Sequence, residues 1–60
     1  MGKLRVFLTP VEVAEELRLN LLTIYRYIRS GELPAMRFGR SYRIEDKDLN
    51  EFINKRKIKL

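Results

Sequence analysis

Histidine and cysteine are both absent from this chain of 60 residues. Their absence excludes disulfides, thiolate nucleophiles, imidazole bases and most zinc sites. It also means that the sequence does not indicate whether the protein works in an oxidising or a reducing compartment. Apolar runs are only two or three residues long. The sequence therefore predicts neither a membrane span nor the core of a signal peptide. Without a targeting signal, we expect a cytoplasmic protein.

A chain of this length forms one domain and buries only about 60% of the surface that its unfolded state exposes. A large enclosed active site is not expected in so small a core. Asp46, Asp48 and Glu51 cluster near a helix start, where capping and the helix dipole explain them. No base, nucleophile or glycine-rich phosphate loop accompanies them. We therefore expect no enzyme, no cofactor and no metal site.

The positive charge is concentrated in the middle of the chain. The net charge is +5, whereas residues 1–17 carry −1 and residues 44–60 carry +1. Residues 18–43 hold six arginines against Glu32 alone. The planar guanidinium fork suits phosphates and guanine edges better than a lysine ammonium does. A simple solvated basic surface is the alternative interpretation.

Two helices with a tight connection are predicted from capping signals. Thr9, Pro10 and Glu12 form a capping box that opens a helix over residues 10–18. Asn20 opens a second helix over residues 21–30, and Gly31 ends it. The short connection forces the helices to cross steeply, as in a helix-turn-helix.

The remainder of the chain predicts a β-hairpin over residues 36–44 and a last helix over residues 46–56. A three-residue loop, Gly39 to Ser41, would gather the hairpin's apolar side chains on one face, and we prefer this register to a two-residue Gly39-Arg40 turn. Arg37 and Arg43 would then be cross-strand neighbours on the outer face. Like charges in that position destabilise a hairpin. A bound phosphate backbone would remove this repulsion.

The second helix presents a mixed apolar and basic stripe to solvent. At about 100° per residue, Ile24, Tyr27 and Ile28 form the inner side. Leu22, Arg26 and Arg29 fall on the other side, with Tyr25 on the flank. In a helix-turn-helix this outward face enters the major groove. The two arginines could bind guanine or phosphate, Tyr25 could bond a phosphate, and Leu22 could contact a thymine methyl.

Residues 8–53, LTPVEVAEELRLNLLTIYRYIRSGELPAMRFGRSYRIEDKDLNEFI, resemble the excisionase and AlpA-type group of small DNA-binding domains, relatives of the MerR helix-turn-helix. The resemblance lies in the LTP start, the TIYR and IRSGELP segments, and RFGR followed by YRI. It implies a winged helix-turn-helix, mostly α with a small β-hairpin. It implies that the second helix lies in the major groove and the hairpin wing on the adjacent minor groove. The residues that it implies for DNA contact are Thr23, Tyr25, Arg26, Arg29, Arg37, Arg40, Ser41 and Arg43.

On this basis, residues 8–54 are expected to form the DNA-binding domain. Residues 1–7 are an N-terminal arm or edge strand, and residues 55–60 are a basic tail. Three positions depart from the family pattern. Arg18 stands where a glycine is usual in the turn, and Leu21-Leu22 stand where small polar or basic residues are usual. Leu21 could anchor the second helix on the core from its flank, and the pair could also form a patch for a protein partner.

The leading hypothesis is a sequence-preferring double-stranded DNA-binding protein, associated with the nucleoid. It would be an excisionase that assists a site-specific recombinase, or a small regulator that acts with the transcription machinery, and it could self-associate cooperatively on DNA. The alternative is an interaction module that docks on a larger recombinase or regulator through Leu21, Leu22 and the tail. RNA binding is disfavoured because most aromatic residues are expected to pack in the core, which leaves no platform on which RNA bases could stack.

Overall fold

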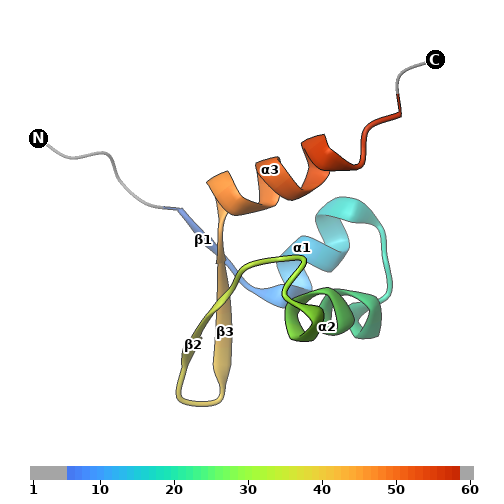
Figure 1. Ribbon diagram of the computed structural model, residues 1–60. Coiled ribbons are helices and arrows are strands. Elements are labelled where there is room, and N and C mark those ends of the chain that lie inside the picture. The colour runs from blue at the N-terminus through green and yellow to red at the C-terminus, as the bar shows by residue number, and fades with distance from the viewer. Residues whose placement is uncertain (1–5, 59–60) are drawn as a thin grey trace, which may run out of the picture.

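A computed structural model describes residues 6–58 of the chain. Its elements in chain order are β1 (Phe7–Leu8), α1 (Pro10–Leu17), α2 (Leu21–Ser30), β2 (Met36–Phe38), β3 (Ser41–Glu45) and α3 (Asp46–Lys55). Three helices surround one core, and the β2–β3 hairpin extends from it beside α2 (Figure 1). This arrangement confirms the predicted winged helix-turn-helix, mostly α with a small β-hairpin.

Helix α1 begins at the predicted capping box. The Thr9 hydroxyl accepts a hydrogen bond from the Glu12 backbone N–H at 3.1 Å, and the Glu12 carboxylate accepts one from the Thr9 backbone N–H at 2.8 Å. Pro10 occupies the first helical turn, where a missing N–H breaks no helical hydrogen bond. The inner face of the helix then buries Val13 and Ala14.

The turn between α1 and α2 is built around Arg18. This residue caps α1 with φ 56° and ψ 45°, and it is the one non-glycine residue of the described chain with a positive φ. The Leu19 backbone N–H donates to the Ala14 carbonyl at 2.9 Å, which closes the helix end. The Asn20 side chain accepts a hydrogen bond from the Leu22 backbone N–H at 2.8 Å and opens α2. The left-handed conformation explains why glycine is favoured at position 18.

The C-terminal end of α2 positions the start of the wing. Gly31 has a φ of 83°, so the chain reverses there without a side-chain clash. The Leu33 backbone N–H donates to the Tyr27 carbonyl at 3.1 Å, and the Leu33 side chain is fully buried. Leu33 therefore fixes the loop between α2 and β2 to the core.

The sheet has three antiparallel strands in the order β1-β3-β2. Phe7 pairs with Glu45 and Leu8 with Ile44, so the segment before α1 supplies a short edge strand beside β3. The remainder of the predicted arm, residues 1–5, and the last tail residues, 59–60, lie outside the described residues. Within residues 6–58, no helix has both the length and the apolar character that a bilayer crossing requires.

The register predicted for the hairpin is wrong. Gly39 and Arg40 form a two-residue loop, which pairs Phe38 with Ser41, Arg37 with Tyr42 and Met36 with Arg43. Gly39 has a φ of 63°, whereas Arg40 has no positive φ. A glycine with positive φ at the first loop position is typical of a type II′ turn, which matches the twist of the flanking strands. Turn geometry thus overrides the apolar pattern.

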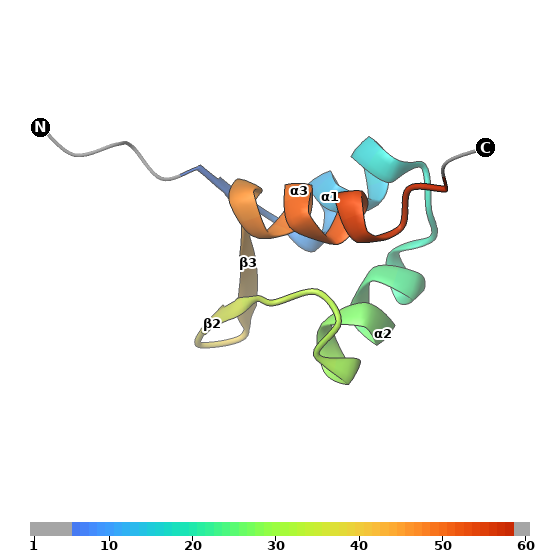
Figure 2. The ribbon, with the colours of Figure 1, turned by 45° about the horizontal axis from the view of Figure 1, so that its top comes forward.

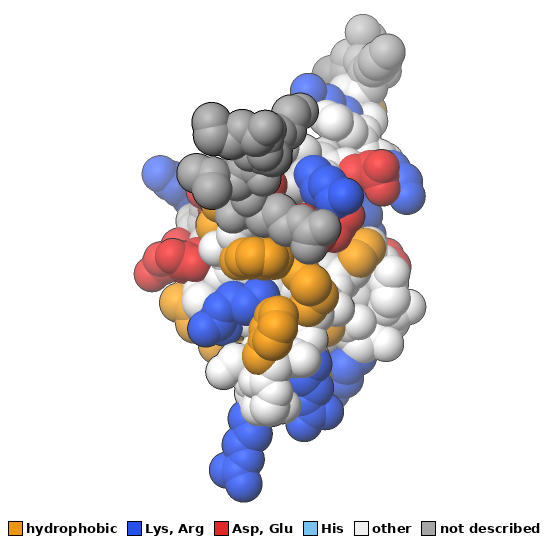
Figure 3. All heavy atoms as spheres, turned by 90° about the vertical axis from the view of Figure 1, so that its left-hand side faces the viewer, with side chains coloured by type: hydrophobic (Ala, Val, Ile, Leu, Met, Phe, Trp, Pro, Cys, Tyr) orange, Lys and Arg blue, Asp and Glu red, His pale blue; other side chains and the backbone are white. Residues whose placement is uncertain are grey.

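This register sends Arg37 and Arg43 to opposite faces of the ribbon. Ile44 is fully buried, so Tyr42 and its cross-strand partner Arg37 share the face that looks toward the core and α2. Phe38 lies on the other face and is 58% exposed. The predicted contact between Arg37 and Arg43 does not form, and neither does the predicted single apolar face. Hydrophobic side chains instead gather on the outside of the molecule, above basic side chains at the wing end (Figure 3).

The core is a single cluster to which every helix contributes. Its buried members are Val13, Ala14, Ile24, Leu33, Ile44, Leu49 and Phe52. Leu21 and Tyr27 are partly buried and pack against it from α2. Their packing leaves the opposite side of α2 free to face solvent. Figure 2 shows α2 and the hairpin on the same side of the molecule, away from α3.

Candidate nucleic-acid interface

The outward stripe of α2 has the composition that the helical spacing predicts. Ile24 is fully buried, whereas Leu22 is 67% exposed. Arg26 and Arg29 are also exposed, at spacings of four and three residues. Such spacing places the three exposed side chains along one line of the helix surface. The helix therefore presents an apolar residue in its first turn, followed by two guanidinium groups.

An aromatic contact joins α2 to the wing. The rings of Tyr25 and Tyr42 lie 6.0 Å apart between centroids with an interplanar angle of 63°. Edge-to-face pairs of this kind contribute about 0.5–1.5 kcal/mol beyond the area that they bury. The contact sets the position of β3 relative to α2. Tyr42, which is not among the residues predicted to contact DNA, is therefore a positioning residue of this surface.

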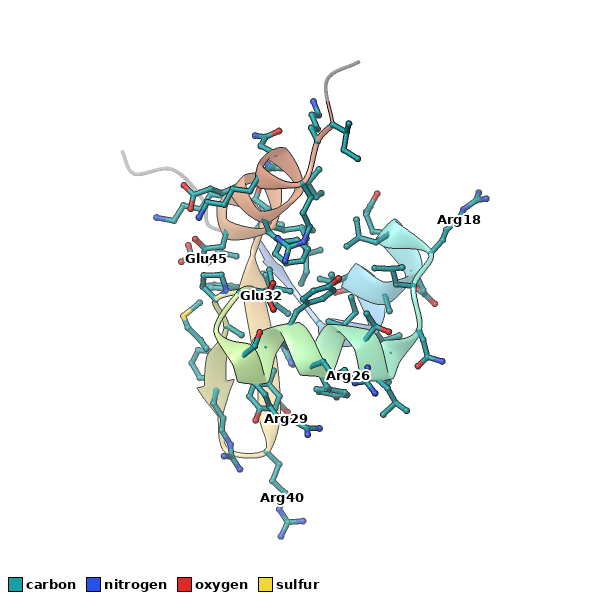
Figure 4. All side chains as sticks on the ribbon, turned by 45° about the vertical axis from the view of Figure 1, so that its right-hand side comes forward. Arg18, Arg26, Arg29, Glu32, Arg40 and Glu45 are labelled. Carbon is teal, nitrogen blue, oxygen red and sulfur yellow. The ribbon has the colours of Figure 1, made fainter. Side chains whose placement is uncertain are left out.

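Arg37 and Arg40 carry the basic charge of the wing on the side of α2. The Arg37 Nε donates to the Gly39 carbonyl at 2.8 Å, and its guanidinium carbon lies 5.8 Å from the Tyr42 ring centroid. Arg40 occupies the loop itself and projects from the wing tip (Figure 4). We call the surface formed by Leu22, Arg26, Arg29, Arg37 and Arg40 the α2–wing face.

Three of the predicted contact residues lie outside the centre of this face. Arg43 is partly buried, and its Nη1 donates to the Tyr42 carbonyl at 2.8 Å on the far side of the ribbon. Ser41, the partner of Phe38, shares that far side. Thr23 is partly buried on the flank of α2. The structure therefore brings the arginines of α2 together with Arg37 and Arg40, but not with Arg43.

The cations of the α2–wing face form no ion pair with a carboxylate of the described residues, 6–58. In residues 6–58, no carboxylate forms an ion pair with Arg26, Arg29 or Arg40. Figure 4 shows these three side chains on the side away from α3, whereas Glu32 and Glu45 lie toward α3. Glu32 is already engaged by Arg56 at 2.6 Å. The face is thus a cluster of exposed guanidinium groups that no carboxylate of the described residues neutralises through an ion pair.

Arg56 was predicted to belong to a basic tail, but it has a structural role. Its guanidinium carbon lies 3.8 Å from the Phe52 ring centroid and 4.9 Å from that of Tyr27, in addition to the ion pair with Glu32. Beside it, residues of α1, α2 and α3 line a shallow apolar hollow of about 300 Å³, among them Leu17 and Tyr27. No sequence signal identified this hollow, because its lining residues come from three separate segments.

Comparison with known proteins gives the family. A family model described as "Helix-turn-helix domain" matches residues 7–57, and the chain belongs to this family. In Mycobacterium tuberculosis, "Putative DNA-binding protein Rv0500A" is 44% identical over 46 residues, which cover 77% of this chain and 59% of the relative. In Bacillus subtilis, "Uncharacterized protein YvgK" is 44% identical over 44 residues, which cover 73% of this chain and 14% of that protein. This chain therefore spans less than two thirds of either relative. No solved structure gives a significant match.

Proposed function

We propose that this chain is a sequence-preferring, non-enzymatic protein that binds double-stranded DNA. Helix α2 enters the major groove, and the wing follows the adjacent backbone and minor groove. The observation that carries the proposal is the α2–wing face, whose exposed arginines have no carboxylate partner in residues 6–58. Each phosphate that such a cation neutralises releases counterions and favours binding. The helix-turn-helix family and the name of the mycobacterial relative support the same function.

Each contact residue has a role that follows from its place in the fold. In this proposal Arg26 and Arg29 bind base edges or phosphates within the groove. Arg37 and Arg40 bind phosphates beside the minor groove. Tyr25 and Thr23 lie at the flank of α2, where hydroxyl groups can bond the backbone. Ser41 and Arg43 lie on the far side of the wing, where they contact only the DNA backbone.

We propose two biological roles for this DNA binding. The excisionase and AlpA-type resemblance favours a factor that acts beside a site-specific recombinase, or a small transcriptional regulator. A single module of this size buries only about 600–1,000 Å² on DNA. High affinity therefore requires a partner or a second copy on an adjacent site.

The test is fluorescence anisotropy of the intact chain on random-sequence duplex DNA over a salt series. We expect a steep fall in affinity with salt and, for Arg26→Ala/Arg40→Ala, a loss of about two phosphate contacts from the slope. Arg18→Ala is the matched control, because Arg18 is exposed and projects away from the α2–wing face (Figure 4). It should leave the slope nearly unchanged. Absence of salt-dependent binding at low ionic strength would contradict the proposal.

A protein-docking function is the second candidate, and we propose a different surface for it from the predicted Leu21–Leu22 patch. Leu21 packs against the core, so it does not form an exposed patch with Leu22. The apolar hollow beside Arg56 is the better surface for a protein contact. Binding through it would be nearly insensitive to salt, in contrast to binding through arginine.

A further inference from the structure

Leu22 is the most exposed large apolar side chain within the helices and strands of residues 6–58, at 67%. It lies in the first turn of α2. Viewed down the helix axis, its direction falls between those of Arg26 and Arg29 on the outward side. The 2.8 Å hydrogen bond from its backbone N–H to the Asn20 side chain fixes the start of the helix. Leu21, its neighbour, packs against the core. The exposure is therefore specific to the position that faces outward among the arginines.

The chemistry of the major groove restricts what a leucine can recognise there. Leucine neither donates nor accepts a hydrogen bond, whereas most of each base edge consists of donors and acceptors. Covering those groups with an apolar side chain removes their water and provides no replacement partner. The one apolar group on a standard base edge in this groove is the C5 methyl of thymine. 5-Methylcytosine displays the same group at the same position.

We propose that Leu22 selects a 5-methylpyrimidine in the bound DNA. This inference rests on the proposed function, because it requires α2 to enter the major groove. The first turn of the second helix is the part that approaches base edges in helix-turn-helix proteins. Leu22 contacts the methyl group there, while Arg26, one turn further along the same stripe, binds a neighbouring base pair or phosphate. Thymine and 5-methylcytosine are then both accepted at a position where cytosine and uracil are disfavoured.

The experiment begins with selection of duplexes from a random-sequence pool by the intact chain. The most enriched duplex is then remade with deoxyuridine in place of each thymine in turn, which removes only the methyl group. We expect binding to weaken about fourfold at one or two positions, the effect of burying one methyl group. At such a position, 5-methylcytosine should bind about fourfold more tightly than cytosine in otherwise identical duplexes. These two arms separate the two sources of the methyl group.

Three variants connect the preference to the side chain. Leu22→Ala should bind the thymine and uracil duplexes equally, and Leu22→Met should retain the preference. Val11→Ala is the matched control, because Val11 is 50% exposed but lies on α1. It should behave as the unsubstituted chain does. These readouts compare two ligands for each variant, so a general loss of stability would not imitate them.

Two results would overturn the inference and leave the proposed function intact. One is equal binding of thymine and uracil at every position of the enriched duplex. The other is salt-dependent binding with no enriched sequence. Failure to bind any duplex at low ionic strength would instead overturn the proposed function itself. The same measurements therefore distinguish the two failures.

Discussion

Arg56 and the arginines of the α2–wing face differ in what they contact within the domain. Arg56 contacts Glu32, Phe52 and Tyr27, so its charge and its planar surface are both engaged within the domain. Arg26, Arg29 and Arg40 have no comparable ion pair in the described part of the chain. The charge of these exposed guanidinium groups is therefore not engaged by any carboxylate of the described fold. A basic residue that the fold does not use is available for an external anion.

The largest effect that separates the two regions should come from Arg26→Ala/Arg29→Ala. A specific arginine contact in the major groove is worth about 1–3 kcal/mol, so DNA affinity should fall about 100-fold or more. The free energy of unfolding should change by less than about 0.5 kcal/mol, since both side chains are exposed. Anisotropy and chemical denaturation measure the two quantities. A large loss of stability with little loss of affinity would reverse the comparison.

Arg56→Ala should give the opposite result. Loss of the aromatic contacts and the ion pair should lower the free energy of unfolding by about 1–2 kcal/mol. DNA affinity should change by less than it does for either groove arginine. Urea denaturation and anisotropy on the same preparations test this expectation. An Arg56→Ala protein of unchanged stability but much weaker DNA binding would place Arg56 in the interface.

Arg18→Gly should raise the free energy of unfolding by about 1 kcal/mol, because it relieves the positive φ of 56° at the end of α1. The control is Arg18→Ala, which removes the same charge but keeps a Cβ in the left-handed conformation. It should bring no gain. Thermal denaturation of both variants separates the backbone effect from the charge effect, and equal gains would show that charge is the cause.

Phe38→Ala should have the smallest effect, a loss of less than about 1 kcal/mol, because Phe38 is 58% exposed on the outer face of the wing. With the predicted three-residue loop, Phe38 would lie on the same face as the fully buried Ile44, and removal of a buried phenylalanine ring costs about 3–5 kcal/mol. The free energy of unfolding therefore reports directly on the register of the hairpin. A loss in the larger range would favour the register that the structure rejects.

Local signals in the sequence predicted most of the fold. The capping box at Thr9, the Asn20 cap and Gly31 placed both helices of the helix-turn-helix, and the sequence marked Arg18 as a departure from the glycine that is usual in the turn. Local residues determine these features, so a single sequence contains the information. The sequence did not decide whether the first residues form an arm or an edge strand, because β3, the partner of the strand at Phe7–Leu8, lies far along the chain.

The composition of the site was predictable, but its geometry was not. The stripe of Leu22, Arg26 and Arg29 follows from helical periodicity alone. The grouping of the wing arginines depended on the hairpin register, where the conformation of Gly39 outweighed the apolar pattern. The contact between Tyr25 and Tyr42 and the packing of Arg56 join distant segments. Periodicity within one element gives no information on such contacts.

The most direct test of the central claim is NMR mapping of the chain during titration with a short duplex at low salt. We expect the largest shifts at backbone amides of α2 and at the side-chain Nε–Hε groups of Arg26, Arg29 and Arg40. The Nε–Hε group of Arg56 should remain almost unchanged. Shifts concentrated around Arg56 and the apolar hollow, with α2 and the wing unaffected, would contradict the assignment of DNA binding to the α2–wing face.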